Sequence, residues 1–324
     1  MSKHMDCSGL TDVGKVRAAN EDAFLIADLR KSMDIHQTSL GHDDRTKLFG
    51  KSEGKLLVVA DGLGGHAAGG RASTVAIDRL TAYLLSSMRW LFRLEAGLED
   101  DFLSDLEAAL KQCQEHIRAE SEFMPERHGM GTTLTMAYVL WPRLFVVHVG
   151  DSRCYLLRES SLEQITTDHT FAQAFADQGD VDPKLACQPR WSHTLWNVVG
   201  GTSDELKPEV YKAELHVGDT LLLCTDGLTK GVGDGEIAKL LGEEGTASDL
   251  CRRLVDAANE AGGKDNVSVI VARFRRAEQS QEAAETEAFF REIDQKAEAG
   301  PATASLAEAE MVSPLERERK PSKG

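Results

Sequence analysis

The sequence predicts an α+β protein built from apolar strands and amphipathic helices. Runs such as Leu56–Ala60 and Leu221–Cys224 have the length and apolar content of buried strands. Residues 99–120 instead carry apolar side chains at the spacing of one helical face. Between Leu144 and Leu157 two strand-like runs lie only a few residues apart, which indicates a tight strand–turn–strand rather than a parallel crossover.

The same two criteria predict the remaining elements in chain order. Apolar runs and polar/apolar alternation predict strands at residues 5–14, 23–27, 56–60, 130–139, 144–149, 154–157, 209–215, 221–224 and 267–274. Helical spacing predicts helices at residues 66–94, 99–120, 171–178, 234–241 and 246–261. Residues 30–54 are polar and irregular, and we expect a long loop there.

Two further segments define the domain organisation. Residues 160–201 are loop-rich and form a candidate flap. Beyond residue 275 the composition changes to Ala, Glu, Gln, Lys and Pro. We therefore expect one domain over residues 1–275 and a tail over 276–324, helical at first and then disordered.

Composition narrows the class of protein. With 41% hydrophobic and 28% charged residues, the chain is typical of a soluble globular protein. The excess of 53 acidic over 37 basic residues argues against nucleic acid or an anionic membrane as partner. Six dispersed cysteines, no signal peptide and no membrane-spanning stretch favour the reducing cytoplasm.

The glycine-rich turn after Leu56–Ala60 has more than one interpretation. Asp61 directly follows the strand, and Gly62-x-Gly64-x-x-Ala67 leads into a helical pattern. This pattern occurs in dinucleotide-binding turns, although Asp61 would then place a negative charge beside a pyrophosphate. A metal site using the Asp61 carboxylate and the Gly62 carbonyl is the second interpretation. A plain strand–turn–helix with Asp61 as a helix cap is the third.

Four aspartates occupy comparable positions at predicted strand ends: Asp61, Asp151, Asp226 and Asp265. Packed sheets can bring such ends together at one edge, where four carboxylates would repel one another unless divalent cations lay among them. Oxygen ligands without a nearby Cys or His set favour Mg²⁺ or Mn²⁺. Two such ions suit displacement at phosphorus, and Arg17 is a candidate for binding the phosphate.

Six ordered segments resemble the protein phosphatase 2C family, the metal-dependent serine/threonine phosphatases, in its bacterial form. These segments are Asp12–Asp22, Ala60–His66, Gly129–Thr133, Val149–Arg153, Thr225–Leu228 and Lys264–Ser268. They span most of residues 10–275. The resemblance implies a four-layer α-β-β-α sandwich with two central antiparallel sheets and a metal cleft at one edge.

The resemblance also implies which residues bind metal. Asp61 would bridge two cations, Mn²⁺ or Mg²⁺, and the carbonyl of Gly62 would bind one of them. Asp226 and Asp265 would hold the other. Asp151, together with Asp226, would form a third and weaker site.

Further residues match family positions around the metals. Glu21 would reach the cluster through water, Asp22 would support it from behind, and Arg17 would bind the substrate phosphate. Eukaryotic members place a His directly after Asp-Gly, where it is thought to protonate the leaving group. Here that position is Leu63, so His66 or metal-bound water is the candidate donor.

The activity implied by the resemblance is hydrolysis of phosphoserine and phosphothreonine in proteins by a hydroxide that bridges the two metals. Phosphoproteins, as substrates of a serine/threonine kinase, would be the partners of a cytoplasmic monomer. Two other classes remain to be compared. One is a catalytically inactive binding module of the same fold, and the other is a nucleotide-binding oxidoreductase.

Overall fold

The computed structural model of the chain describes residues 5–34, 47–64, 67–87, 99–178, 191, 193–203 and 205–275. The contacts within the chain divide it into two units, Met1–Arg276 and Ala277–Gly324. The predicted tail over residues 276–324 lies outside the described residues, so the described fold belongs to the first unit.

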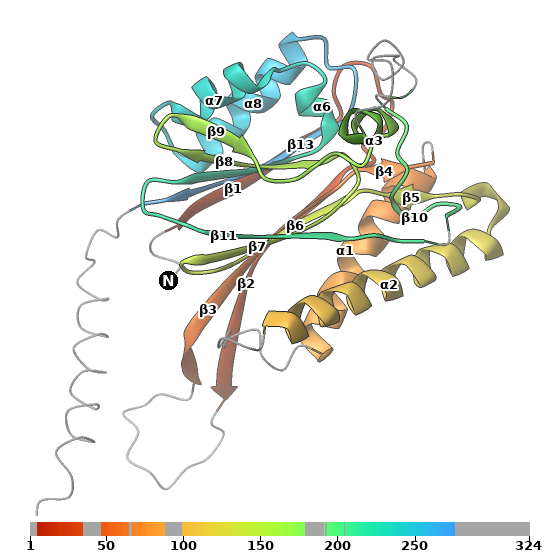
Figure 1. Cartoon of the computed structure of the whole chain (residues 1–324), viewed down its shortest axis with the longest axis horizontal. Helices are drawn as coiled ribbons and strands as arrows, with labels where there is room; N and C mark the ends of the chain where they lie inside the picture. Colours follow the sequence, from red (N-terminus) through yellow and green to blue (C-terminus); the bar gives the residue numbers. More distant parts are fainter. Residues whose placement is uncertain are drawn as a thin grey trace, which may run out of the picture. The chain divides into compact units, whose positions relative to one another are not determined.

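Two antiparallel five-stranded sheets form the centre of this unit (Figure 1). The first sheet contains, in spatial order, β1 (Met5–Asp12), β13 (Val267–Phe274), β12 (Thr220–Cys224), β8 (Arg153–Arg158) and β9 (Ser161–Gln164). The second contains β11 (Glu209–Glu214), β7 (Arg143–Val149), β6 (Leu134–Leu140), β3 (Lys47–Ala60) and β2 (Ala23–Asp34). Every described strand pair in both sheets is antiparallel.

The apolar strands are buried on both faces, which explains why they read as continuous apolar runs. In β3, Leu57 and Val59 pack into the core between the sheets, whereas Leu56 and Val58 belong to the core on the helical side. The side chains of β12 alternate in the same way between the core shared by the two sheets and the core under its helices. Because strand side chains alternate in direction, one apolar run supplies two cores.

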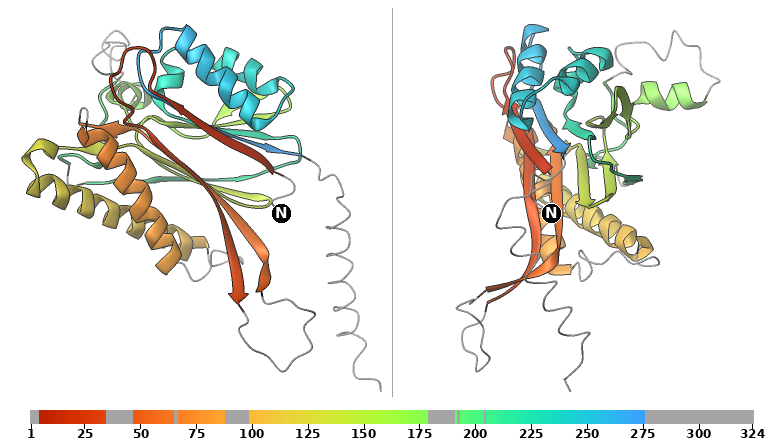
Figure 2. Two further views of the ribbon diagram at one scale, coloured as in Figure 1. Left: turned by 180° about the vertical axis from the view of Figure 1, so that it is seen from behind. Right: turned by 90° about the vertical axis from the view of Figure 1, so that its left-hand side faces the viewer.

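Helices cover the outer face of each sheet. The second sheet is covered by α1 (Ala67–Ser87) and α2 (Glu99–Phe123), whose apolar faces share a core with its strands. The first sheet is covered by α7 (Asp234–Gly242) and α8 (Ala247–Glu260) in the same manner. Figure 2 shows the resulting order of layers from behind and from the side. The predicted four-layer α-β-β-α sandwich is confirmed.

Short elements lie near one edge of the sandwich. A small third sheet joins β4 (Gly62–Leu63), β5 (Gly131–Thr132) and β10 (Val199–Gly200). The other helices in the described part of the chain are α3 (Phe171–Gln178), α6 (Asp226–Thr229) and the 3₁₀ turn η2 (Pro125–Arg127). None of the described helices is both long and apolar enough to cross a membrane.

Two of the predicted loops are shorter than expected. Strand β2 continues to Asp34 and β3 begins at Lys47, with Arg30 paired to Glu53 and Ser32 to Phe49. Residues 30–34 and 47–54 of the expected 30–54 loop are therefore strand, and residues 35–46 lie outside the described residues. The ends of the expected 160–201 flap form β9 and β10. Backbone pairing extends past the apolar part of a hairpin, and a search for apolar runs cannot detect such an extension. Residues 179–190 and 192 of the flap lie outside the described residues.

Candidate active site

The four aspartates meet at one edge of the sandwich. Asp61 follows β3 and Asp151 comes two residues after the end of β7, both in the second sheet, while Asp226 and Asp265 adjoin β12 and β13 of the first. All four line one pocket of about 270 Å³. Arg17, Glu21 and Gly62, which the sequence also predicted as site residues, line it too.

The end of β3 is fixed by threonines of the neighbouring segment. The backbone N–H of Asp61 donates to Thr133 Oγ1 at 2.9 Å, and the Thr133 N–H donates to the Asp61 carbonyl at 2.9 Å. Thr132 Oγ1 donates to the same carbonyl at 2.8 Å. These bonds hold the backbone at Asp61 independently of its side chain, so the carboxylate is left to face the pocket.

Gly62 is required by close packing rather than by a bound nucleotide. A Cβ at this position would lie 2.1 Å from the carbonyl oxygen of Gly69 in α1 and 2.7 Å from that of Glu21. Only glycine lets β4 approach these two backbones. Because β3 pairs antiparallel with both β2 and β6, the glycine-rich turn does not belong to a parallel βαβ unit, and the dinucleotide interpretation is wrong.

Asp151 lies on a turn that a histidine supports. Gly150 adopts φ 111°, a conformation that favours glycine. The backbone N–H of Gly150 donates to His169 Nδ1 at 3.1 Å. The backbone N–H of His169 donates to the Gly150 carbonyl at 2.7 Å. Burial lowers the pKa of His169, which keeps the ring neutral and Nδ1 able to accept. The Asp151 turn is thereby tied to the base of the predicted flap.

Cationic side chains contact the two aspartates of the first sheet. Arg17 bonds to Asp265 through Nε at 2.7 Å and Nη2 at 3.0 Å. Lys230 Nζ lies 2.5 Å from Asp226 Oδ2 and 2.7 Å from Asp265 Oδ2. Burial opposes ionisation of Asp265, but Lys230 and Arg17 outweigh it and lower the pKa of that carboxyl.

Behind these residues, Asp22 and Asn266 connect the N-terminal segment to the site. Asp22 Oδ2 accepts a bond from Thr225 Oγ1 at 2.8 Å, directly before Asp226 in the chain. Asn266 Oδ1 accepts the Glu21 N–H at 2.9 Å, and its Nδ2 donates to the carbonyls of Val13 and Ala19. Asp22 is not among the residues that line the pocket.

For the other two aspartates, Asp61 and Asp151, the nearby positive charge of Lys230 does not offset burial and the neighbouring carboxylates. Burial, reinforced by Asp22 and Asp226, raises the pKa of Asp61 well above its ordinary value. Burial and Asp226 raise the pKa of Asp151 to about 7. Two buried oxygens, Asp226 Oδ1 and Asp22 Oδ1, accept no hydrogen bond from the described residues. Clustered carboxylates with unpartnered oxygens fit a hard divalent cation.

The described side chains of the pocket are not arranged as a complete set of metal ligands. Within the described ranges, no three Asp, Glu, His or Cys side chains surround a common point as metal ligands do. Lys230 and Arg17 lie against the carboxylates instead. In this structure, Lys230 and Arg17 are therefore the cationic partners of Asp226 and Asp265.

This excess of negative charge predicts how metal-free protein responds to pH. Burial and Asp226 raise the pKa of Asp22 and of Asp151 to about 7, above the ordinary 3.8. Such groups stabilise the fold below about pH 4, and their contribution is lost as the pH rises through about 7. In EDTA the melting temperature should therefore fall between pH 5 and pH 8, less steeply in Asp151→Asn, and added Mn²⁺ should restore it at pH 8. A melting temperature in EDTA that is flat or rises over this range would contradict this account.

Comparison with known proteins agrees with the geometry. The sequence model described as protein phosphatase 2C matches residues 35–272, and the chain belongs to this family. It is 39% identical over 224 residues to the serine/threonine protein phosphatase PstP of Mycobacterium tuberculosis, covering 67% of this chain and 40% of PstP. It is 30% identical over 221 residues to the serine/threonine phosphatase stp of Listeria monocytogenes, covering 68% of this chain and 85% of stp.

The fold is similar to that of solved structures of the same family. One is the catalytic domain of PstP in complex with two manganese ions, with a TM-score of 0.64 and 34% identity over 84% of this chain and 99% of that domain. The predicted family is thereby confirmed. The match spans about two fifths of the length of the M. tuberculosis relative.

Some pocket residues were not predicted from the sequence. His193, Lys230 and Asn266 line the pocket, as does Leu63, which occupies the position discussed above for a proton donor. The spacing Asp226–Lys230 is the i,i+4 pattern of an ion pair, but it gives no indication of the second contact to Asp265. His66, the predicted proton donor, lies outside the described residues.

Proposed function

We propose that this protein hydrolyses phosphoserine and phosphothreonine in proteins with the help of Mn²⁺ or Mg²⁺. The observation that carries the proposal is the convergence of Asp61, Asp151, Asp226 and Asp265 on one pocket, with Arg17 on its rim. Four carboxylates beside a guanidinium suit a site that binds cations and a phosphate together. The names of the relatives, PstP and stp, point to the same reaction.

Two cations would be held by Asp61, the Gly62 carbonyl, Asp226 and Asp265, with Asp61 shared between them. Once bound, they would supply positive charge for the phosphate oxygens and acidify water near neutral pH. The manganese-bound PstP domain supports this choice of metal. Glu21 lines the same pocket and Asp22 supports Thr225 from behind, so both would orient the ligands rather than replace them.

Arg17 would bind the phosphate of the substrate. Its side chain is 52% exposed while two of its nitrogens bond to Asp265, so Asp265 orients the guanidinium at the mouth of the pocket. A planar guanidinium can donate two parallel bonds to phosphate oxygens. We therefore propose that Arg17 binds the phosphate and orients it, and that His66 or metal-bound water donates the proton to the leaving alkoxide.

Phosphate release from a phosphothreonine peptide tests the proposed function. We expect turnover with Mn²⁺ or Mg²⁺ and none in EDTA, restored by re-addition of metal. Equal turnover in EDTA would exclude the proposed role of the aspartates. No turnover under any metal condition would favour the inactive binding module, against which the presence of all four aspartates in one pocket argues.

A third, weaker cation site is proposed at Asp151 and Asp226. Asp151 is 8% exposed and approaches the cluster from the opposite sheet. We expect Asp151→Asn to remove a low-affinity event from a calorimetric Mn²⁺ titration and to slow turnover, with the tight events unchanged. Loss of the tight events as well would show that Asp151 belongs to the main site.

We expect Leu63 to make the site favour an aryl leaving group over an alkyl one. It lines the pocket but has no proton to donate, and general acid catalysis is typically worth about 10²–10⁴-fold for a basic leaving group. We expect Leu63→His to raise the rate for phosphothreonine peptide relative to p-nitrophenyl phosphate. If His66→Ala selectively slows the peptide, His66 is the donor in the parent. If neither variant changes the ratio, side-chain protonation is not limiting and the role given to Leu63 is wrong.

The proposed partners are phosphoproteins modified by a serine/threonine kinase. We further propose that the protein acts as a monomer in the cytoplasm. The five cysteines in the described part of the chain are all free thiols, as a reducing compartment requires. Residues 1–275 would form the catalytic domain and residues 276–324 an accessory tail.

A further inference from the structure

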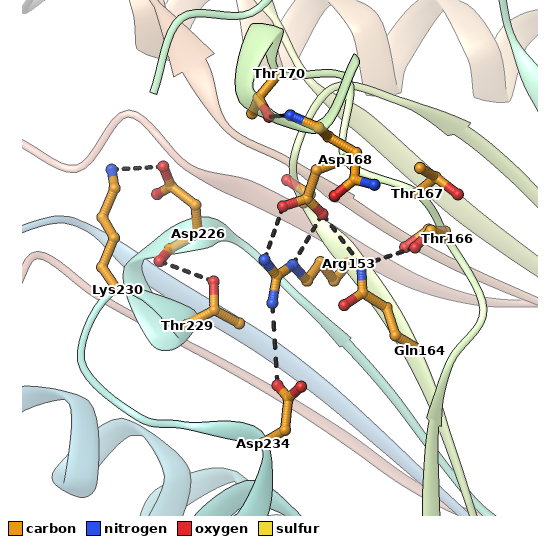
Figure 3. A network of polar contacts seen from close by, with 12 residues as sticks. Arg153, Gln164, Thr166, Thr167, Asp168, Thr170, Asp226, Thr229, Lys230 and Asp234 are labelled. Carbon is orange, nitrogen blue, oxygen red and sulfur yellow. Dashed lines mark hydrogen bonds and ion pairs between the residues drawn. The ribbon is translucent and has the colours of Figure 1, made fainter. Parts of the chain in front are cut away.

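Lys230 is a cationic side chain of the pocket that lies between two of its aspartates. It lies directly after α6, one helical turn beyond Asp226, and 27% of its side chain is exposed. Its ammonium group points toward the Asp226 carboxylate, as Figure 3 shows. The same nitrogen reaches Asp265, which precedes β13, so Lys230 connects the two ligand positions of the first sheet.

The contacts of Lys230 with Asp226 and Asp265 differ from an ordinary surface ion pair because they are shielded from water. The side chains of Asp226 and Asp265 are 14% and 15% exposed, so all three groups are largely shielded from water. The charge of Lys230 also favours ionisation of Asp61 and Asp151, on the opposite sheet. Arg17, in contrast, is half exposed and bonds to Asp265 alone of the four aspartates.

We propose that Lys230 is a tethered cation that competes with divalent metal for Asp226 and Asp265. This inference rests on the proposed function, because it assumes that these aspartates hold metal. The ammonium nitrogen lies at hydrogen-bond distance from one oxygen of each carboxylate. A divalent cation bound to those oxygens would be repelled by an ammonium group that close.

Loading of the site therefore requires Lys230 to withdraw. Its four-carbon stem is flexible, unlike the planar fork of an arginine. In metal-free protein, Lys230 reduces the repulsion among the carboxylates and keeps the strand ends together. It thereby lowers the metal affinity of the site and stabilises the empty site.

Calorimetric titration of Mn²⁺ into metal-free Lys230→Met and parent protein tests the inference. Methionine keeps an unbranched side chain of similar length, one atom shorter, and removes its charge. We expect the main site of Lys230→Met to bind Mn²⁺ about tenfold more tightly. Lys239→Met, on the exposed side of α7, removes the same charge away from the pocket and should bind like the parent.

Thermal melting gives the second measurement. In EDTA, Lys230→Met should melt at a lower temperature than the parent, whereas at saturating Mn²⁺ the difference should vanish. Unchanged or weaker Mn²⁺ binding by Lys230→Met would overturn the inference, as would equal tightening in Lys239→Met. Absence of Mn²⁺ binding in the parent would instead reject the metal site of the proposed function, so the two failures are distinguishable.

Discussion

Replacing Asp61 with asparagine is expected to lower turnover of a phosphothreonine peptide by about 10³-fold or more. Asp61 is the proposed ligand shared by both cations, and an amide brings no charge to the site. Its backbone is fixed by Thr132 and Thr133, so the strand end should stay in place without the carboxylate.

The same substitution should leave the protein folded. Burial, Asp22 and Asp226 all disfavour the charged form of Asp61, so the neutral amide relieves repulsion in metal-free protein. We expect the melting temperature of Asp61→Asn in EDTA to equal or exceed that of the parent. Asp256→Asn, exposed on α8, is the matched control and should behave as the parent in both assays. Retention of a tenth of the activity by Asp61→Asn would contradict the role proposed for this residue.

Replacing Gly62 with alanine should damage both stability and activity. The added Cβ would lie 2.1 Å from the Gly69 carbonyl oxygen and 2.3 Å from its carbon, and these are backbone atoms that a rotamer change cannot move. We expect the free energy of unfolding to drop by about 2–4 kcal/mol, in the range of overpacking and backbone effects. Any relief by movement of β4 would displace Asp61, so turnover in the surviving folded protein should fall as well.

A second glycine provides the control for that experiment. Gly235 lies in α7, and a Cβ there would meet nothing within 4 Å. Gly235→Ala should leave activity unchanged and stabilise the protein slightly, because alanine is the better helix former. If urea unfolding gives the same stability for Gly62→Ala as for Gly235→Ala, the close packing of β4 against α1 is not important for the fold.

The fold was predictable from the sequence where burial leaves a pattern. Strands β3 and β12 are covered on both faces, and their apolar runs mark them clearly. Strand β9, with alternating exposed and half-buried residues, lies at a sheet edge and was not distinguished from a loop. The two-residue strands β4 and β10 are too short to carry any period, so only tertiary contacts reveal them, whereas β5 fell within the predicted strand at residues 130–139.

The candidate site was predictable to the extent that its residues repeat one motif. The aspartates each adjoin a predicted strand, and the chemistry of a metal-bound phosphate pointed to the Gly62 carbonyl and to Arg17 beside them. The structure brings all of these residues to one pocket. Lys230 was missed because an i,i+4 pair with Asp226 resembles any helical ion pair until Asp265 is seen beside it. Asn266 was missed because it acts through backbone groups of Val13, Ala19 and Glu21, which no side-chain pattern encodes.

The central claim is that the aspartates at the strand ends hold divalent cations. Anomalous diffraction from crystals grown with Mn²⁺ tests it most directly, because the signal identifies the metal and its position. The account predicts two Mn²⁺ peaks about 3.5–4 Å apart in the pocket, with Asp61 between them and Asp226 and Asp265 as ligands of one. Mn²⁺ bound only elsewhere, or a pocket without an anomalous peak at saturating Mn²⁺, would contradict it.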